Sequence, residues 1–297
     1  MERTAWAKIN LALHVTGRRA DGYHLLQSLV TFAATGDRCG DRLRFSASGE
    51  DQFTMSGRFA EGLPTGTDAG GGNLVLLARD LLRSHLEALG RSAPQVHIHL
   101  DKTLPVASGI GGGSADAAAV LSGLNQLWDG GLSLTALKEL GLTLGADLPM
   151  CLTGRPLFAG GIGEEIVPVA NLPGFALVLV NPLVAVSTPA IFGSLASKTN
   201  PPLVLPEGAL TFDGWIDALS GMRNDLEAPA TGHAPEIGAV SSALSGQGAR
   251  LVRMSGSGAT CFGIFETAAE AEAAAGRLEA AHPGWYIAAT ETARGGA

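Results

Sequence analysis

Apolar and polar residues alternate near the start of the chain. In residues 7–15 every second position is apolar: Ala7, Ile9, Leu11, Leu13 and Val15. Lys8 and Asn10 are polar residues between them. Successive side chains of a β-strand point to opposite faces, so this pattern predicts a strand with one apolar face. Lys8 and Asn10 would then stand side by side on the other face.

The first third of the chain is predicted to be rich in strands. A glycine- and aspartate-containing cluster at residues 17–22 is followed by strand-like runs at 25–33 and 42–47, and another alternating run lies at 96–100. Clusters of this kind favour tight turns. We therefore expect the early runs to form one antiparallel sheet.

Helical signals are interleaved with these strands. Asn73 precedes apolar residues at helical spacing, and Thr267 with Glu270 forms a capping box ahead of an alanine-rich run. Further helices are predicted after Ala115 and at 135–144, and buried strands at 175–180 and 260–265. Because hairpins and helices are mixed in this way, the predicted fold class is α+β rather than a doubly wound parallel sheet.

One glycine-rich loop stands between a predicted strand and a predicted helix. It comprises Pro105, Val106, Ala107, Ser108, Gly109, Ile110, Gly111, Gly112, Gly113, Ser114 and Ala115. Glycines let backbone N–H groups turn inward, and the following helix adds the positive end of its dipole, so the segment is a candidate phosphate site. It is neither a Walker A loop, which needs a lysine after its last glycine, nor a dinucleotide-binding fingerprint. A merely flexible turn is the alternative.

Two charged residues are candidates for acid–base chemistry. Asp147 lies between a predicted helix end and Pro149 in an apolar stretch, and Lys8 lies on the polar face of the first strand. Taken singly, they could be a turn residue and a solvated lysine. Together they could form the carboxylate and cation that a phosphoryl transfer to a hydroxyl requires.

Other polar residues have weaker signals. Tyr23 and His24 follow a turn and could clasp a flat ligand, or simply pack on a neighbouring strand. Residues 255–258, Ser-Gly-Ser-Gly, could be a second anion-binding nest or a hairpin turn. His97 and His99 share a strand face without a third ligand at suitable spacing, so we expect them to be structural and predict no metal-binding residues.

Composition narrows the classes of function. The 297 residues are 46% hydrophobic and 16% charged, which is typical of a globular chain long enough for two domains. A net charge of -8 argues against a nucleic-acid partner, which demands a basic surface. Three widely spaced cysteines suggest no disulfide framework, and neither a targeting segment nor a membrane span is found. We expect a cytoplasmic protein.

Three ordered motifs resemble those of the galactokinase, homoserine kinase, mevalonate kinase and phosphomevalonate kinase (GHMP) superfamily. They are Lys8–Leu11, Pro105–Ala115 and Met254–Gly258. The resemblance implies an N-terminal domain like domain 2 of ribosomal protein S5, expected at 1–160, and a ferredoxin-like C-terminal domain, expected at 161–297. It also implies an active site in the cleft between them.

Within that superfamily, residues 16–24, 142–149 and 188–192 resemble kinases that phosphorylate the 2-hydroxyl of a cytidyl diphosphate derivative of methylerythritol, in the non-mevalonate isoprenoid pathway. The implied cofactor is ATP with Mg²⁺, with the loop 105–115 around its phosphates. Asp147 would be the base, and Lys8 would lower its pKa and orient it. The residues implied to bind substrate are Asn10, Tyr23, His24, Thr188 and Phe192, with Tyr23 and Phe192 stacking on the cytosine.

Two alternatives remain open at this stage. Another GHMP kinase, of the homoserine or mevalonate type, would keep Lys8, the glycine loop and Asp147 but would not explain Tyr23, His24 and Phe192. A nucleotide-binding sensor without catalysis would not need both Lys8 and Asp147. The expected oligomeric state is a monomer or a homodimer.

Overall fold

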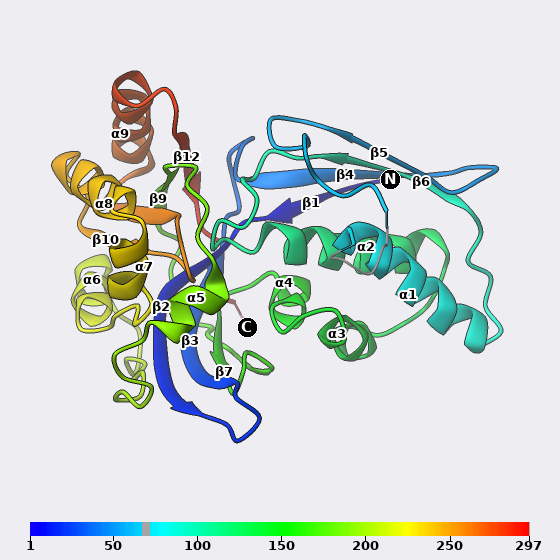
Figure 1. Cartoon of the computed structure of the whole chain (residues 1–297), viewed down its shortest axis with the longest axis horizontal. Helices are drawn as coiled ribbons and strands as arrows, with labels where there is room; N and C mark the ends of the chain where they lie inside the picture. The colour runs from blue at the N-terminus through cyan, green and yellow to red at the C-terminus, as the bar shows by residue number, and fades with distance from the viewer. Residues whose placement is uncertain (67–71, 297) are drawn as a thin grey trace. The chain divides into compact units, whose positions relative to one another are not determined.

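A computed structural model of the chain describes residues 1–66 and 72–296 (Figure 1). The chain divides into two compact units that alternate along the sequence. Unit 1 consists of Met1–Ala7, Gly40–Val106 and Gly111–Thr153, and unit 2 consists of Lys8–Cys39, Ala107–Ile110 and Gly154–Ala297. In the described ranges, no helix combines the length and apolar character needed to cross a membrane.

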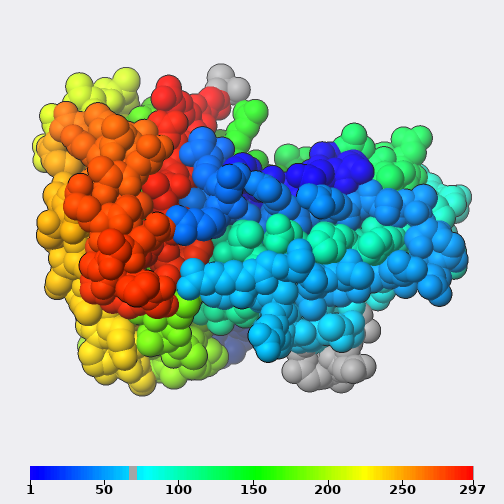
Figure 2. Space-filling view, turned by 90° about the horizontal axis from the view of Figure 1, so that it is seen from above, coloured from blue at the N-terminus to red at the C-terminus, as the bar shows by residue number. Residues whose placement is uncertain are grey.

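In its described residues, unit 1 contains four helices and a four-stranded sheet with strand order β1-β4-β6-β5. Its elements are β1 (Glu2–Trp6), β4 (Gly40–Ala47), β5 (Gln52–Ser56), α1 (Leu74–Ala88), β6 (Val96–Asp101), α2 (Gly112–Leu127), α3 (Leu134–Leu142) and α4 (Leu148–Thr153). β5 runs parallel to β6, and the other neighbours are antiparallel. The helix α2 packs against β1 and β4 on one side and against α1, α3 and α4 on the other. The outer face of the sheet, blue to cyan in Figure 2, exposes Arg44, Ser46, Thr54 and Ser56.

Unit 2 contains two four-stranded antiparallel sheets. The first has the order β2-β3-β7-β8, from β2 (Lys8–Arg18), β3 (His24–Phe32), β7 (Leu157–Gly160) and β8 (Glu165–Pro168). The second has the order β10-β11-β9-β12, from β9 (Ala176–Asn181), β10 (Leu251–Met254), β11 (Cys261–Phe265) and β12 (Tyr286–Glu291). The helices are α5 (Thr188–Gly193), α6 (Phe212–Ser220), α7 (Glu227–His233), α8 (Glu236–Gly246) and α9 (Ala268–Ala281).

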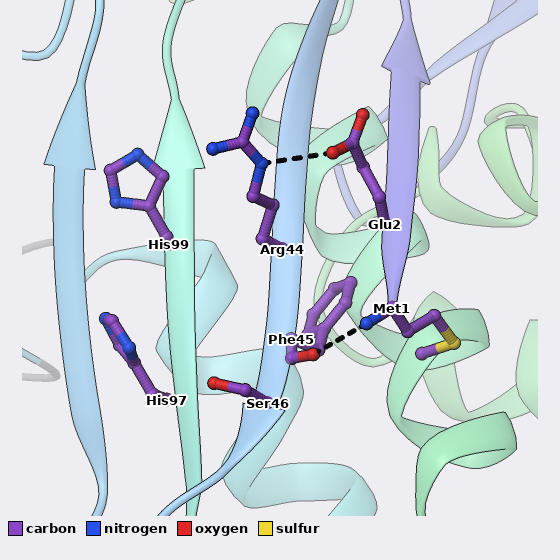
Figure 3. Close-up of a pocket in the computed structure, with 7 residues that line it drawn as sticks. All are labelled: Met1, Glu2, Arg44, Phe45, Ser46, His97 and His99. Atoms are coloured by element: carbon purple, nitrogen blue, oxygen red, sulfur yellow. Dashed lines mark hydrogen bonds and ion pairs between the residues drawn. The ribbon is translucent and has the colours of Figure 1, made fainter.

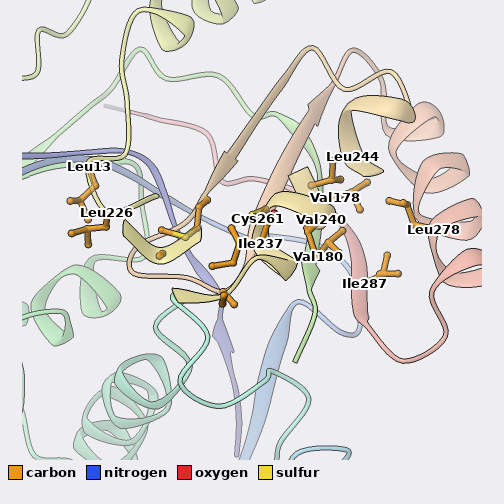
Figure 4. Packing of buried hydrophobic residues seen from close by; sticks show 14 of the residues in the cluster. Leu13, Val178, Val180, Leu226, Ile237, Val240, Leu244, Cys261, Leu278 and Ile287 are labelled. Carbon is orange, nitrogen blue, oxygen red and sulfur yellow. Dashed lines mark hydrogen bonds between the residues drawn. The ribbon is translucent and has the colours of Figure 1, made fainter. Parts of the chain in front are cut away.

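The main core of unit 2 lies between its second sheet and the helices α8 and α9 (Figure 4). Every residue of β9 is buried, as expected for a strand that pairs on both sides and is covered by helices. The Thr267 half of the capping box that opens α9 is formed, with Glu270 N donating to Thr267 Oγ1 at 3.2 Å, while the Glu270 carboxylate accepts from Glu266 N at 3.2 Å. The α+β fold in two parts is confirmed.

The structure differs from the sequence prediction in how the early strands are grouped. The runs at 7–15 and 25–33 pair as β2 and β3, but the run at 42–47 is β4 and pairs with β1 and β6 in the sheet of unit 1. The prediction of one sheet was therefore wrong. The reason is that Leu43 and Phe45 of β4 belong to the core around α2, which local alternation cannot reveal.

The first strand is more deeply buried than its alternation suggested. Both faces of β2 are covered, and Lys8 and Asn10 are only 5% and 3% exposed. The interpretation of Lys8 as a solvated lysine is wrong. The expected domain boundary near residue 160 stays a prediction. The two compact units alternate along the chain, and residues 8–39 belong to the same unit as the C-terminal half.

A cluster of three charged side chains is buried in unit 1. Lys102 follows β6, and its Nζ lies 2.6 Å from Asp41 Oδ2 of β4 and 2.6 Å from Asp116 Oδ2 of α2. Asp41 Oδ1 accepts hydrogen bonds from the backbone N–H groups of Thr103 and Leu104. Burial opposes the charge on Lys102, but the two carboxylates outweigh it and raise the pKa of this lysine. The cluster links a sheet strand, the segment after β6 and α2.

The stability of the fold is expected to depend on pH through Asp116. Burial and the neighbouring Asp41 raise the pKa of Asp116 to about 8 against the pull of Lys102. The protonated form is therefore favoured on folding, so its contribution is complete below the unfolded pKa of about 4 and is lost as pH rises through about 8. Urea unfolding from pH 5 to 9 should show the wild type losing stability, on the order of a few kcal/mol, relative to Asp116→Asn. A difference that does not change with pH would show that Asp116 keeps its ordinary titration.

Candidate active site

The middle of the glycine loop is fixed to other backbone segments of unit 2. Ile110 O accepts a hydrogen bond of 2.9 Å from the N–H of Lys8, at the start of β2. Gly109 O accepts from Ser255 Oγ at 3.0 Å. The first and third motifs of the sequence therefore meet the second within one unit.

Gly109 occupies a position that no larger residue could fill without a shift. Its φ of +77° lies in the left-handed region, and a Cβ atom there would lie 2.4 Å from Ser255 O and 2.8 Å from Gly258 N. Only glycine permits this close approach without strain. The conformation of the loop and that of the Ser255–Gly258 segment thus depend on each other.

The loop ends where α2 begins, in unit 1. Gly111 is the N-cap, with a φ of +67°, and it has no side chain to cap the first N–H groups of the helix. These groups have no partner within the helix, and the dipole makes this end attractive to an anion. The predicted order of strand, glycine loop and helix is present, and the residues fit a phosphate group.

Asp147 and Lys8 are placed in different units. Asp147 immediately precedes α4, where it is partly buried and its backbone carbonyl accepts from Cys151 N at 3.1 Å. Lys8 opens β2 in unit 2 and is almost fully buried. The catalytic roles expected for both residues stay predictions.

The side chain of Asn10 has one hydrogen-bonded polar atom and one that lacks a partner. Its Nδ2 donates to Ser28 Oγ at 2.8 Å, and its backbone N–H donates to Ser255 Oγ at 3.1 Å. Its Oδ1 is buried without a hydrogen-bond partner among the described residues. Buried amide oxygens are nearly always bonded, so Oδ1 fits a ligand that brings a hydrogen-bond donor.

His24 and Phe192 lie against each other in unit 2. Their ring centroids are 4.8 Å apart, with an interplanar angle of 25°. Burial lowers the pKa of His24, and the positive charges of Arg18 and Lys198 lower it further, so the imidazole is neutral near pH 7. Its Nε2 is buried and has no partner among the described residues. A neutral imidazole has one donor and one acceptor nitrogen, which suits the polar edge of a base.

The other expected substrate residues are less tightly held. Tyr23 is 62% exposed, and in the described structure it is His24 rather than Tyr23 that stacks on Phe192. The expected sandwich of a cytosine between Tyr23 and Phe192 stays a prediction. Thr188 opens α5, and its Oγ1 lies 2.7 Å from Ser257 Oγ in the third motif.

One residue that supports this site was missed from the sequence. Asn224 Nδ2 donates at 2.8 Å to both Met254 O and Gly256 O, and so fixes the backbone of the third motif. Its Oδ1 accepts from Leu226 N at 3.0 Å, like a local cap. From the sequence, an asparagine before a short helix is interpreted only as a helix cap. No local signal therefore indicated the long-range contacts of Asn224.

His97 and His99 border a pocket on the outer sheet face of unit 1 (Figure 3). Thr54 Oγ1 lies 2.8 Å from a ring nitrogen of each histidine, and Ser56 Oγ lies 3.0 Å from the other nitrogen of His99. Among the described residues, no group of three or more His, Cys, Asp or Glu could hold a metal ion. Hydrogen bonding within the sheet accounts for these histidines. The pocket is lined by Met1, Glu2, Arg44, Phe45, Ser46, His97 and His99.

Comparison with known proteins identifies the family. Residues 73–155 match the GHMP kinases N terminal domain, and residues 212–284 match the GHMP kinases C terminal domain. A 4-diphosphocytidyl-2-C-methyl-D-erythritol kinase of Rhizobium meliloti is 61% identical over 97% of this chain and 93% of its own length. A crystal structure of 4-(cytidine 5'-diphospho)-2C-methyl-D-erythritol kinase matches with a TM-score of 0.78 and 34% identity, covering 99% of this chain and 100% of that one.

A homoserine kinase from Cytophaga hutchinsonii shares the fold at a TM-score of 0.63, covering 99% of this chain and 96% of its own, but is only 18% identical. The homoserine-type alternative therefore has support from the fold alone. The 4-diphosphocytidyl-2-C-methyl-D-erythritol kinases match at higher identity and extend over nearly the whole chain. The chain belongs to the 4-diphosphocytidyl-2-C-methyl-D-erythritol kinase family of the GHMP kinases.

Proposed function

We propose that this ATP-dependent kinase transfers the γ-phosphoryl group of ATP to the 2-hydroxyl of 4-diphosphocytidyl-2-C-methyl-D-erythritol, a step of the non-mevalonate isoprenoid pathway. Its relatives at about 60% identity carry this substrate in their names. The observation that supports this substrate at the site is that two buried atoms, Asn10 Oδ1 and His24 Nε2, have no hydrogen-bond partner among the described residues. Both belong to residues expected to bind the substrate. In the described part of unit 2, the one other buried side-chain atom without a hydrogen-bond partner is Trp215 Nε1.

The nucleotide is proposed to bind through backbone groups. The first turn of α2 presents N–H groups to the phosphates, while the middle of the loop is held in shape by Lys8 and Ser255. Such fixed dipoles stabilise charge that develops during transfer without having to reorganise. The ATP-binding residues proposed are those from Pro105 to Ala115.

The hydroxyl is proposed to be activated by Asp147. Its carboxylate accepts the proton as the hydroxyl oxygen forms a bond to the γ-phosphorus, and the bond from that phosphorus to the bridging oxygen breaks to release ADP. Lys8 supplies a positive charge that favours the ionised carboxylate and offsets the charge of the moving phosphoryl group. Asn10 is proposed to orient the substrate through its free Oδ1.

Magnesium is proposed to enter with ATP and to neutralise part of the phosphate charge. Magnesium sites of this kind use substrate phosphates and waters with one or two protein ligands. The Ser114 hydroxyl in the first turn of α2 could contribute a ligand, and no metal-binding residue is assigned.

Phe192→Ala is expected to weaken substrate binding. The loss of one stacked ring should cost about 1–3 kcal/mol, or roughly a 5- to 150-fold rise in Kd for the cytidyl substrate. Calorimetric titration of the substrate measures this directly, and Val167→Ala, an exposed change in the same unit, serves as control. An unchanged Kd would remove Phe192 from the substrate site.

The cellular location, oligomeric state and binding partners of the enzyme are also part of the proposal. A cytoplasmic enzyme acting as a monomer or homodimer, with a small-molecule substrate and no nucleic-acid partner, fits the acidic composition. The substrate supplies its own negative charges, and Arg18 and Lys198 near His24 suit such a ligand.

A coupled ADP-release assay with Mg-ATP tests the function. Four acceptors are compared: the cytidyl substrate, methylerythritol phosphate without the cytidyl group, homoserine and mevalonate. We expect turnover with the cytidyl compound alone. Turnover with another acceptor would support kinase activity but exclude the proposed binding of a cytidyl group. No turnover with any of the four acceptors would favour a nucleotide-binding sensor.

A further inference from the structure

The buried ion cluster of unit 1 lies directly beneath the first turn of α2. A Cβ atom on Gly112 would lie 3.2 Å from Lys102 Nζ and 3.8 Å from Asp41 Oδ2. Gly112 is the first residue of α2, so its backbone belongs to the turn proposed to face the phosphates. The ammonium group therefore supports this turn from its inner side.

The same cluster also holds the other end of the loop. Asp41 Oδ1 accepts hydrogen bonds from Thr103 N at 2.6 Å and Leu104 N at 2.8 Å, immediately before the loop. Lys102 then connects Asp41 to Asp116, immediately after the loop. A loop rich in glycine loses much conformational entropy when it is ordered, and fixing both ends in advance reduces this cost at the moment of binding.

We propose that Lys102, Asp41 and Asp116 are positioning residues for ATP, which hold the two ends of the glycine loop so that the first turn of α2 directs its N–H groups at the phosphates. The inference rests on the proposed use of this loop for ATP. It assigns a function to buried charges that neither the acid–base chemistry nor the substrate contacts require.

Charge at the cluster should also affect ATP binding. Asp116 Oδ1 is buried and lacks a hydrogen-bond partner among the described residues, so a proton on this carboxyl is not opposed by a donor. With that proton the cluster is neutral, and without it the cluster carries one negative charge beneath the phosphate site. Because ATP is itself a polyanion, loss of the proton should weaken its binding.

The charges that act on Asp116 come from within the cluster. Lys102 and Asp41 are the charged groups that shift its pKa. Around α2, Arg3 of β1 contacts Gln126 near the far end of the helix, and Arg79 and Arg83 of α1 interact with Asp51. The other ionisable residues on or beside the elements packed against α2 are Glu2, Arg42, Arg44, Asp80, His85, Glu87, Lys138, Glu139, Asp147 and Cys151.

The first test compares two variants at one position. Asp116→Leu fills a similar volume, leaves Lys102 paired with Asp41 and removes the link to α2. We expect Kd and KM for ATP to rise at least about tenfold, with KM for the cytidyl substrate within about twofold. Asp116→Asn can still accept a hydrogen bond from Lys102 and should restore ATP binding to near wild type. Glu87→Gln, an exposed change on α1, is the control.

Several outcomes would overturn the proposal. Wild-type ATP affinity in folded Asp116→Leu would show that the link does not position the nucleotide. An equal rise in KM for both substrates, or failure of Asp116→Asn to restore binding, would indicate a general structural role. Circular dichroism and thermal unfolding of each variant establish that it is folded.

If Asp116→Leu does not fold, the proposal is tested by the pH dependence of ATP binding in the wild type and in Asp116→Asn. We expect Kd for ATP to rise between pH 7 and 9.5 in the wild type more than in the variant, by about threefold or more, because only the wild type gains a buried negative charge. Parallel curves for the two proteins would refute the proposal.

Discussion

Asp147→Asn is expected to lower kcat at least about a hundredfold while leaving the Kd for ATP nearly unchanged. The amide has the shape of the carboxylate but cannot accept the proton of the attacking hydroxyl. Asp147 precedes α4 and is not one of the loop residues proposed to bind ATP, so we expect the nucleotide contacts of the glycine loop to be retained. Steady-state ADP release and titration with a non-hydrolysable ATP analogue measure the two quantities separately.

The control for this prediction is Glu139→Gln, which removes an exposed carboxylate of α3 in the same unit. It should retain wild-type kcat. Turnover of Asp147→Asn close to that of the control would exclude Asp147 as the base. A loss of ATP affinity as large as the loss of kcat would instead place Asp147 in nucleotide binding.

Local features of this fold follow closely from the sequence. The caps at Asn73 and Thr267, the alternation in β6 and the glycine loop leading into α2 all depend on neighbouring residues, and each is present. The chemistry of such signals acts within one turn or one strand. Prediction succeeds there because the deciding contacts are short in sequence.

Long-range features could not be derived in this way. Alternation in β2 suggested a solvated polar face, yet Lys8 and Asn10 are buried, and their backbone N–H groups bond to distant segments, that of Lys8 to Ile110 O and that of Asn10 to Ser255 Oγ. The pairing of β4 with β1, and the support that Asn224 gives to the third motif, likewise depend on distant backbone. Which sheet a strand joins is decided by packing that a single sequence does not display.

The candidate site shows the same division between local and distant contacts. The glycine loop could be proposed as an anion site from its own residues, whereas the proposed substrate-binding residues came from a family resemblance. The Lys102 cluster escaped sequence analysis because its three members are separated by 61 and 14 positions and no periodicity connects them. Buried charges are recognised by their partners, which only the structure supplies.

Gly109→Ala is expected to disable the nucleotide site while the rest of the chain remains folded. A left-handed φ costs a residue with a Cβ about 1–2 kcal/mol, and the overlap with Ser255 O and Gly258 N adds about 1–3 kcal/mol. The total of about 2–5 kcal/mol must be relieved by moving either the loop or the third motif, so Kd for ATP should rise at least about thirtyfold. Nucleotide titration measures this change.

Gly276→Ala is the matched control for that experiment, since Gly276 lies within α9, where an added Cβ meets nothing within 4 Å. Alanine is favoured over glycine inside a helix by about 0.8–1 kcal/mol, so this variant should be slightly more stable and fully active. If Gly109→Ala binds ATP as tightly as Gly276→Ala does, the close approach of the loop to Ser255 does not shape the phosphate site. A thirtyfold loss confined to Gly109→Ala would place the third motif, through its backbone, among the determinants of ATP binding.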